Sequence, residues 1–289
     1  MVDMLLDDDA ATVFFDGTTT DPQLDHPEGV AVHPDGSVWC GGERGQIYRM
    51  DPDGRDLVEV GSTGGFCLGM AFDADASFLY VCDLKLAAVF RVEIASGRVE
   101  RFADGGPDGA FKVPNYPAFG PGGDLFVSDS HAFRVPGPGI WRVDADGRAT
   151  LWFDHDLNFA NGLAFDATGR SLSVAETFGN RISRIEVRED GTAGDVDTFA
   201  ELGEAWPDGL AFDVEGNLYV GCYEPSQILR VDAGGRSALL YREASAHTLA
   251  HPTNVAFRGS TMFTANLGRW HVTRIEVGVE GLALPVGAR

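Results

Sequence analysis

Ala160-Asn-Gly-Leu-Ala-Phe165 and Pro207-Asp-Gly-Leu-Ala-Phe212 are two copies of one pattern, in which a polar turn residue and a glycine lead into an apolar strand. The pattern occurs six times, and the alanines that align in it are Ala31, Ala71, Ala118, Ala164, Ala211 and Ala256. Successive alanines are 40, 47, 46, 47 and 45 residues apart. A repeat of about 40–50 residues that is rich in short strands is typical of a β-propeller blade.

Three further strands follow the alanine in the repeat. The second resembles Leu79-Tyr-Val81, the third ends in an arginine, an aliphatic residue or methionine, and an acid, and the fourth is more polar, as in Thr150-Leu-Trp-Phe153. Six such repeats predict an all-β fold: a six-bladed β-propeller with four antiparallel strands per blade. The segment Ala11–Asp16 resembles the fourth-strand segment Ala149–Asp154, so we expect it to complete the last blade. The segment Gly281–Pro285 is the other candidate for that place.

Composition and charge restrict the class of protein. The chain has 289 residues with no linker between repeats, and we expect residues 1–289 to form a single domain. Its net charge of −22 would repel phosphates, which excludes nucleic acid as a partner. No apolar run is long enough to span a membrane, and the first ten residues lack signal-peptide features. Four cysteines without metal-site spacing are typical of a reducing compartment. We therefore expect a cytoplasmic protein, monomeric or weakly homo-oligomeric, that acts on a small molecule.

One position of the repeat carries ligand-type side chains. The residues three before the aligned alanines are Glu28, Leu68, Asn115, Asn161, Asp208 and Thr253. This position begins the innermost strand of each blade, so the six side chains converge at one mouth of the central channel. Asn or Asp before Gly is also an ordinary turn residue. However, two carboxylates at the centre of a channel would be costly to bury without a cation.

Four of these residues offer only oxygen ligands: Glu28, Asn115, Asn161 and Asp208. Oxygen ligands with a combined charge of −2 suit a hard divalent cation. The sequence therefore predicts one divalent cation, with Ca²⁺ as the expected ion and Mg²⁺, Mn²⁺, Zn²⁺ or Fe²⁺ as alternatives. Coordination positions that the protein leaves open would take water or substrate.

Two further sets of residues surround this ring. The residues two before each ring position form a mostly apolar funnel: His26, Phe66, Val113, Phe159, Trp206 and His251. The ends of the second strands lie beside the starts of the first, and of these residues Asp129 is expected to reach the site. An apolar funnel suits a small, partly apolar substrate. The candidate substrate contacts are Asp129, His26, Tyr116, Phe159, Trp206 and His251. The histidines also fit a packing or capping role, and Asp129 also fits a solvated loop.

At these residues the chain resembles the senescence marker protein/gluconolactonase family of six-bladed propellers. The most specific segments are Ala160–Asp166 and Trp206–Asp213. The resemblance implies a metal-dependent lactonase or a related hydrolase. It also implies that the Glu, Asn and Asp ligands of the family fall on Glu28, Asn161 and Asp208. In the similar diisopropyl fluorophosphatases a second asparagine completes the ligand set, and Asn115 matches it.

The sequence departs from the sugar-lactonase pattern in the third blade. There the sugar lactonases carry an Arg-x-Asn-Asp-Gly segment that holds sugar hydroxyls, whereas this chain reads Lys112-Val-Pro-Asn-Tyr116. The arginine is missing and the pocket is less polar, so gluconolactone itself is not the expected substrate.

The functional hypothesis is metal-assisted hydrolysis of a small lactone. Asp208 is the candidate catalytic residue, as cation ligand and general base, and a nucleophilic role for it stays open. An organophosphate hydrolase would use the same ring, and substrate profiling separates it from a lactonase. A strictosidine-synthase-like condensing enzyme would need no metal, and a non-catalytic propeller that binds peptides or proteins would need no converging acids.

Overall fold

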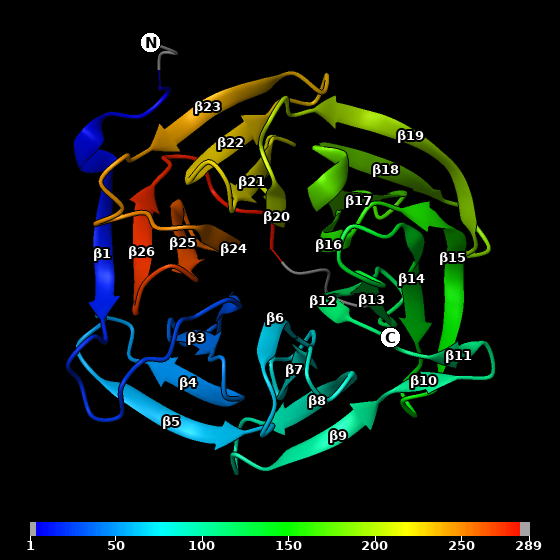
Figure 1. Cartoon of the computed structure of the whole chain (residues 1–289), viewed down its shortest axis with the longest axis horizontal. Coiled ribbons are helices and arrows are strands. Elements are labelled where there is room, and N and C mark those ends of the chain that lie inside the picture. Colours follow the sequence, from blue (N-terminus) through cyan, green and yellow to red (C-terminus); the bar gives the residue numbers. More distant parts are fainter. Residues whose placement is uncertain (1–3, 284–289) are drawn as a thin grey trace.

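The computed structural model describes residues 4–283. In this range six four-stranded antiparallel sheets surround a central axis, with the first strand of each sheet innermost (Figure 1). Within each sheet, strands that follow one another in the chain are hydrogen-bonded neighbours, and only the sixth sheet also takes a strand from elsewhere. The predicted six-bladed β-propeller is therefore confirmed.

The strands of the blades have the following bounds. Blades 1 to 3 consist of β2 (Val30–Val32), β3 (Val38–Gly41), β4 (Gln46–Met50) and β5 (Leu57–Ser62); β6 (Cys67–Phe72), β7 (Phe78–Asp83), β8 (Ala88–Glu93) and β9 (Val99–Ala103); and β12 (Pro114–Phe119), β13 (Leu125–Asp129), β14 (Gly137–Val143) and β15 (Ala149–Leu157). Blades 4 to 6 consist of β16 (Ala160–Phe165), β17 (Ser171–Glu176), β18 (Arg181–Val187) and β19 (Ala193–Glu201); β20 (Pro207–Phe212), β21 (Leu218–Cys222), β22 (Gln227–Val231) and β23 (Ser237–Arg242); and β24 (Pro252–Arg258), β25 (Thr261–Asn266), β26 (His271–Glu276) and β1 (Ala11–Asp16). A small hairpin, β10 (Gly105–Gly106) and β11 (Gly109–Ala110), and two single-turn 3₁₀ helices, Asp8–Ala10 and Thr177–Gly179, complete the elements.

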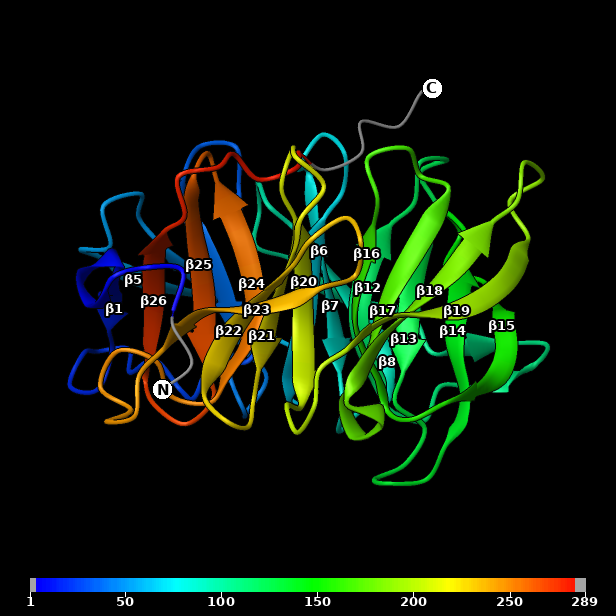
Figure 2. The same cartoon turned by 90° about the horizontal axis from the view of Figure 1, so that it is seen from above.

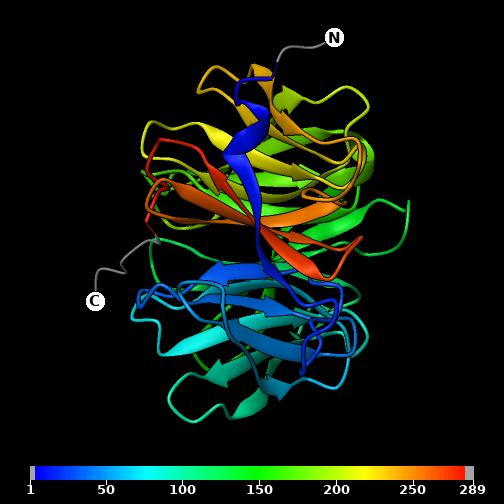
Figure 3. The same cartoon turned by 90° about the vertical axis from the view of Figure 1, so that its left-hand side faces the viewer.

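The N-terminal strand β1 closes the ring. It pairs antiparallel with β26, with Ala11 opposite Ile275 and Asp16 opposite His271. Figure 1 shows the two strands side by side, and in Figure 3 the blue β1 lies on the outside of its blade. The expectation for Ala11–Asp16 is thus confirmed, and the last blade has no missing strand that would leave an unpaired edge. The competing segment goes elsewhere: Gly281 forms an isolated bridge with Asp213 of the fifth blade. Residues 284 and 285 of that segment lie outside the described residues.

The hydrophobic core lies between neighbouring blades. The buried apolar residues form six clusters, and each cluster draws its members from two adjacent blades. In one of them Trp39 and Ile47 of blade 1 pack against Phe72 and Leu79 of blade 2. Inner and second strands are therefore buried on both faces, as the pattern of β17 illustrates. The four cysteines are free and buried in this core.

Glycine allows the innermost strands to approach closely. Gly162 and Gly209 occupy the position two before the aligned alanine, where four of the six repeats have glycine. A Cβ on Gly162 would overlap the carbonyl oxygen of Asp208, and one on Gly209 would lie 2.5 Å from Cα of Asn254. Only a residue without a side chain fits such a contact. The close approach brings the starts of neighbouring inner strands, and their side chains, into one small ring.

The channel has two different mouths. At one, the inner strands begin and carry the predicted ligands. At the other, the ends of the inner strands and residues 280–283 line a mostly apolar cavity of about 480 Å³. The red chain segment before residue 284 runs over this second mouth, on the upper side of the molecule in Figure 2. Between residues 4 and 283, no helix has the length and apolar character needed to cross a membrane.

Candidate metal centre

The four predicted ligands lie together at the first mouth. Asn115, Asn161 and Asp208 are the second residues of β12, β16 and β20, and Glu28 lies two residues before β2. All four side chains are buried. The other two ring positions offer no free ligand, because Leu68 is apolar and the hydroxyl of Thr253 donates to the carbonyl oxygen of Glu28 at 2.6 Å.

Two hydroxyl groups fix the orientation of the asparagine amides. Nδ2 of Asn115 donates to Oγ of Ser130 at 3.0 Å, and that hydroxyl donates to the carbonyl oxygen of Ala160 at 2.7 Å. Similarly, Nδ2 of Asn161 donates to Oγ1 of Thr177 at 3.2 Å, and Thr177 donates to a carbonyl oxygen of the fifth blade at 2.8 Å. A hydroxyl has one proton, so once it donates to a carbonyl it can only accept from its other neighbours. The amide nitrogens must therefore face the hydroxyls, and the amide oxygens face away from them.

These amide oxygens and one carboxylate oxygen have no partner. Oδ1 of Asn115, Oδ1 of Asn161 and Oε2 of Glu28 are buried and accept no hydrogen bond from the described residues. Buried polar atoms are nearly always satisfied, because leaving one unpaired costs about 1–3 kcal/mol. Three unpaired oxygens at equivalent positions of one ring fit a cation, which would satisfy all of them. The residues present therefore suit a divalent metal.

The two acids of the ring have raised pKa values. Burial, followed by the negative charge of Asp208, raises the pKa of Glu28 well above its ordinary value. Burial likewise raises the pKa of Asp208 to about 7, although hydrogen bonds from the Asn161 and Asn254 amides act in the opposite direction. A neighbouring cation favours the charged form of a carboxylate and would lower both values.

Sequence reasoning missed Asn254. This residue is fully buried, and its Nδ2 donates to Oδ1 of Asp208 at 3.3 Å, while its own Oδ1 has no partner among the described residues. It stands at the position where four repeats have glycine, and Tyr116 is the other exception. This departure from the repeat is the signal that could have identified it, because a side chain at that position lies against the neighbouring inner strand.

Asp129 holds the entrance segment of its blade. Its two carboxylate oxygens accept from the backbone N–H groups of Lys112 and Val113, both at 2.8 Å, and of His131 at 2.9 Å. The equivalent carboxylates of Asp83 and Glu176 bind backbone N–H groups in the same way. Asp129 does lie beside the start of the inner strand, as expected, but its oxygens are engaged with the backbone. That it contacts substrate stays a prediction.

The predicted histidines stack on aromatic rings at the rim. The ring of His26 lies 4.5 Å from that of Trp270, and its Nδ1 lies 3.4 Å from Glu43. His251 stacks on Tyr223 at 4.7 Å and donates from Nδ1 to the carbonyl oxygen of Tyr223 at 3.0 Å. A carbonyl only accepts, so Nδ1 of His251 carries a proton. His26, Phe159 and His251 all have a positive φ, between 38° and 64°.

Two of the other predicted substrate contacts, Phe159 and Trp206, belong to a group of four aromatic rings at the first mouth. Phe159 and Trp206 are half-buried at the mouth, and the ring of Phe178 lies 5.0 Å from Phe159 and 5.5 Å from Trp206. The exposed Phe133 packs edge-on against Phe178 at 4.9 Å. These four rings are called the aromatic wall below. Phe133 lies in the loop between β13 and β14, and Phe178 lies in the 3₁₀ helix Thr177–Gly179. Both are outside the repeated pattern, so alignment of the repeats could not find them.

Tyr116 lies deeper in the channel. It is buried, and it lines the cavity at the second mouth. Burial, followed by the negative charges of Glu28 and Asp208, raises the pKa of its hydroxyl. Tyr116 is therefore close enough to both acids to feel their charge, and its contact with substrate stays a prediction.

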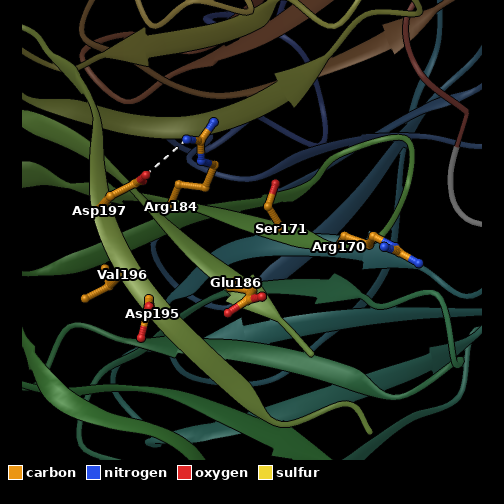
Figure 4. Close-up of a pocket in the computed structure, with 7 residues that line it drawn as sticks. All are labelled: Arg170, Ser171, Arg184, Glu186, Asp195, Val196 and Asp197. Carbon is orange, nitrogen blue, oxygen red and sulfur yellow. Dashed lines mark hydrogen bonds and ion pairs between the residues drawn. The ribbon is translucent and has the colours of Figure 1, made fainter. Parts of the chain in front are cut away.

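Two other groups of polar residues are less suitable sites. Figure 4 shows a groove of about 400 Å³ on the outside of blade 4, where Arg184 and Asp197 pair with each other at 3.0 Å. Asp25, His26 and Glu43 bring ligand-type atoms within 4.8 Å of one another at the rim of blade 1, but Asp25 is already paired with an arginine. Neither place combines burial with unpaired oxygens.

Removing the hydroxyl of Thr177 should weaken cation binding. In Thr177→Val the Asn161 amide loses the acceptor that orients it, so its oxygen is no longer held toward the ring. Loss of such an outer partner typically costs about 10- to 100-fold in metal affinity. Calorimetric titration of Ca²⁺ into chelator-treated protein measures this effect. Thr177→Ser should retain wild-type affinity, and equal affinity of Thr177→Val and wild type would show that the hydroxyl does not position the ligand.

Parts of the chain are similar in sequence to two protein families and to a lactonase. Residues 62–266 match the family described as SMP-30/Gluconolactonase/LRE-like region, and residues 18–50 match the N-terminal part of the strictosidine synthase-like family. Lactonase drp35 of Staphylococcus aureus is 29% identical over 112 residues. This match covers 37% of the chain and 35% of the lactonase, so it spans about a third of either protein.

Solved structures share the fold over nearly the whole chain. A gluconolactonase from Xanthomonas campestris has a TM-score of 0.76 at 19% identity, covering 94% of this chain and 89% of its own. A calcium-binding protein, regucalcin, from Agrobacterium tumefaciens has a TM-score of 0.73 at 18% identity, covering 92% and 96%. At such identities the likeness concerns the fold. The family match spans well over half of the sequence, and the chain therefore belongs to the SMP-30/gluconolactonase/LRE-like family.

Proposed function

We propose that the protein is a divalent-metal-dependent hydrolase that opens a small lactone at the first mouth of the channel. The observation that carries this proposal is the ring of three unpaired, buried oxygens beside the carboxylate of Asp208. Membership of the family and the partial similarity to a lactonase support the reaction type. The likeness in fold to a gluconolactonase and to a calcium-binding protein agrees with it.

Glu28, Asn115, Asn161 and Asp208 would hold the cation. Bound there, a divalent ion supplies Lewis acidity, which polarises the ester carbonyl and stabilises the negative charge that develops on its oxygen. Because all four side chains offer oxygen, Ca²⁺ is the expected ion and Mg²⁺ the nearest alternative. The protein fixes the ligand geometry in advance through Ser130 and Thr177, so little reorganisation is needed during the reaction.

Asp208 is the proposed general base. Its Oδ1 accepts from Asn254, and Oδ2 is the oxygen that would take the proton of the attacking water. Water then forms a bond to the carbonyl carbon, the ring C–O bond breaks, and the leaving alkoxide recovers the proton from Oδ2. The products are a free carboxylic acid and an alcohol within one molecule. Asn254 acts as a positioning residue, because its amide fixes the plane of the Asp208 carboxylate.

A lactone panel tests the proposal. Acid release is followed by pH-stat before and after chelation, and after adding back Ca²⁺, Mg²⁺, Mn²⁺, Zn²⁺ or Fe²⁺ one at a time. Turnover that chelation removes and one ion restores would establish a metal-dependent lactonase. If no lactone is opened with any ion, lactone hydrolysis is rejected, and the same assay with fluorophosphate esters then tests the organophosphate alternative.

A further inference from the structure

The loop between β13 and β14 carries an arginine onto the aromatic wall. This loop begins beside the start of β12, because Asp129 pairs with Pro114, so it lies at the first mouth. The guanidinium carbon of Arg134 lies 4.9 Å from the ring centre of Phe178, 5.5 Å from that of Trp206 and 5.6 Å from that of Phe133. Three rings around one guanidinium hold it by cation–π attraction without using its N–H donors.

The aromatic wall connects Arg134 to the ligand ring. Phe178 directly follows Thr177, whose hydroxyl orients the Asn161 amide. Trp206 is two residues before Asp208 in the chain. A guanidinium that rests on both rings therefore stands at the rim of the proposed catalytic centre, above its blade 4 and blade 5 side.

The donors of Arg134 are uncommitted. Within residues 4–283 its side chain makes neither a hydrogen bond nor an ion pair, although the chain has 44 acidic and 22 basic residues. Two other arginines at this mouth are paired: Arg44 with Asp25 at 2.9 Å and Arg181 with Glu176 at 2.8 Å. Acidic partners are abundant in this protein, yet the guanidinium of Arg134, at the mouth that carries the proposed catalytic centre, keeps its donors free to bind a ligand.

A second basic side chain, that of a lysine, lies at the same rim. Lys112, one of only two lysines in the sequence, places Nζ 3.2 Å from both ring nitrogens of His131, and no carboxylate among the described residues pairs with it. His131 and Arg134 both have a left-handed backbone, with φ of 62° and 55°. Such conformations cost about 1–3 kcal/mol each for residues with side chains, and they gather where function requires a fixed side-chain direction. The strained backbone at His131 and Arg134 thus fits a loop that holds the Arg134 guanidinium in a fixed direction.

We infer that Arg134, assisted by Lys112, binds a carboxylate on the substrate, so that the preferred substrate is a lactone with a free carboxylate group. The planar fork of arginine matches a carboxylate with two parallel hydrogen bonds, and the aromatic wall covers the apolar part of the molecule. A protein with a net charge of −22 and two acids in its site would otherwise repel an anionic substrate. This inference rests on the proposed lactone hydrolysis for its substrate, and it adds Arg134 as a specificity-determining residue.

A binding experiment tests the carboxylate site without turnover. Phenylacetate and its neutral counterpart phenylacetamide are titrated into the cation-loaded protein and followed by calorimetry, with intrinsic tryptophan fluorescence, to which Trp206 contributes, as a second signal. Phenylacetate should bind about 10- to 100-fold more tightly than the amide, as expected for a charge-assisted bidentate pair. Arg134→Met keeps the stem that packs on the rings and should remove most of this preference, whereas Arg134→Lys should keep more of it.

Kinetics with a matched pair of substrates complete the test. A γ-lactone with a ring carboxylate is compared with its primary amide. In the wild type kcat/KM should favour the carboxylate about 10-fold or more. The preference should shrink at high salt. In Arg134→Met most of this preference should be lost, mainly through a higher KM for the carboxylate substrate. Arg49→Met is the matched control, because Arg49 is also exposed and makes no hydrogen bond or ion pair within residues 4–283.

The possible results distinguish the inferred carboxylate site from the proposed lactone hydrolysis. If both lactones are hydrolysed and Arg134→Met leaves their ratio unchanged, the carboxylate site is overturned while the proposed function stands. If neither lactone is hydrolysed but phenylacetate binds in a way that depends on Arg134, the carboxylate site stands and lactone hydrolysis fails. If the variant changes neither binding nor turnover and no lactone reacts, both are wrong.

Discussion

Asp208→Asn is expected to lower kcat for lactone hydrolysis about 10²- to 10⁴-fold, the range typical of a general base, while a cation still binds. Asparagine has nearly the same shape and retains an oxygen for coordination, but it cannot accept a proton at neutral pH. Purified variant and wild type are compared by pH-stat at saturating substrate, and cation binding is measured on the same samples by calorimetry.

Asp213→Asn is the matched control for this experiment. Asp213 is also buried in blade 5, but it lies at the far end of the inner-strand hairpin, where it accepts hydrogen bonds from Asn217 and from the Tyr219 hydroxyl. Its variant should lose stability and keep kcat. Near wild-type turnover of Asp208→Asn with the cation bound would show that Asp208 is not the base.

Cation removal should destabilise the protein, and more so at high pH. The folded-state pKa values of Glu28 and Asp208 lie above ordinary values of about 4, because both groups are buried. The cation-free fold therefore binds more protons than the unfolded chain between these values, and its stability falls as pH rises from about 4 through the folded-state pKa of about 7 for Asp208. A bound cation removes this penalty, so its stabilising effect should be larger at pH 8 than at pH 5.

Thermal unfolding with chelator and with Ca²⁺ measures this effect. A cation at about 100 times its Kd should add about 2.7 kcal/mol, or roughly 4–5 °C in Tm for a chain of this size. The double variant Glu28→Gln, Asp208→Asn lacks both charges. Without cation it should melt above the wild type at pH 8, and Ca²⁺ should stabilise it far less. An equal response of the double variant to Ca²⁺ would place the cation elsewhere.

The repeat explains why so much of the fold could be predicted from the sequence. Six copies of one pattern repeat the same strand boundaries, so an error in one copy is corrected by the others, and Ala11–Asp16 could be assigned by its likeness to another fourth strand. The ring of ligand-type residues could be predicted for the same reason. Alignment of the repeats places Glu28 and Asp208 at equivalent positions of their blades, and the blades surround one channel. The structure brings these side chains together as symmetry requires.

The rest of the site escaped prediction where it departs from the repeat. Asn254 occupies a position that is glycine in four copies, and its contact with Asp208 depends on the close approach of blades, which is a property of packing. Phe133 and Arg134 lie in a loop, residues 130–136, that is longer than the corresponding loops of the other blades. For Asp129, strand pairing gave the right location, but the direction of the carboxylate depends on which backbone N–H groups lack partners nearby.

The pairing of β1 with β26 has a consequence for how the protein is made. Five blades draw all their strands from one continuous stretch, so their contacts are short-range and can form while synthesis proceeds. The sixth unites Ala11 with Ile275, from opposite ends of the chain. Until β26 has been synthesised, β1 has no strand to pair with. A chain that ends before β26 therefore keeps an unpaired strand, which can associate with other chains. Closure of the ring therefore depends on synthesis that has continued through β26.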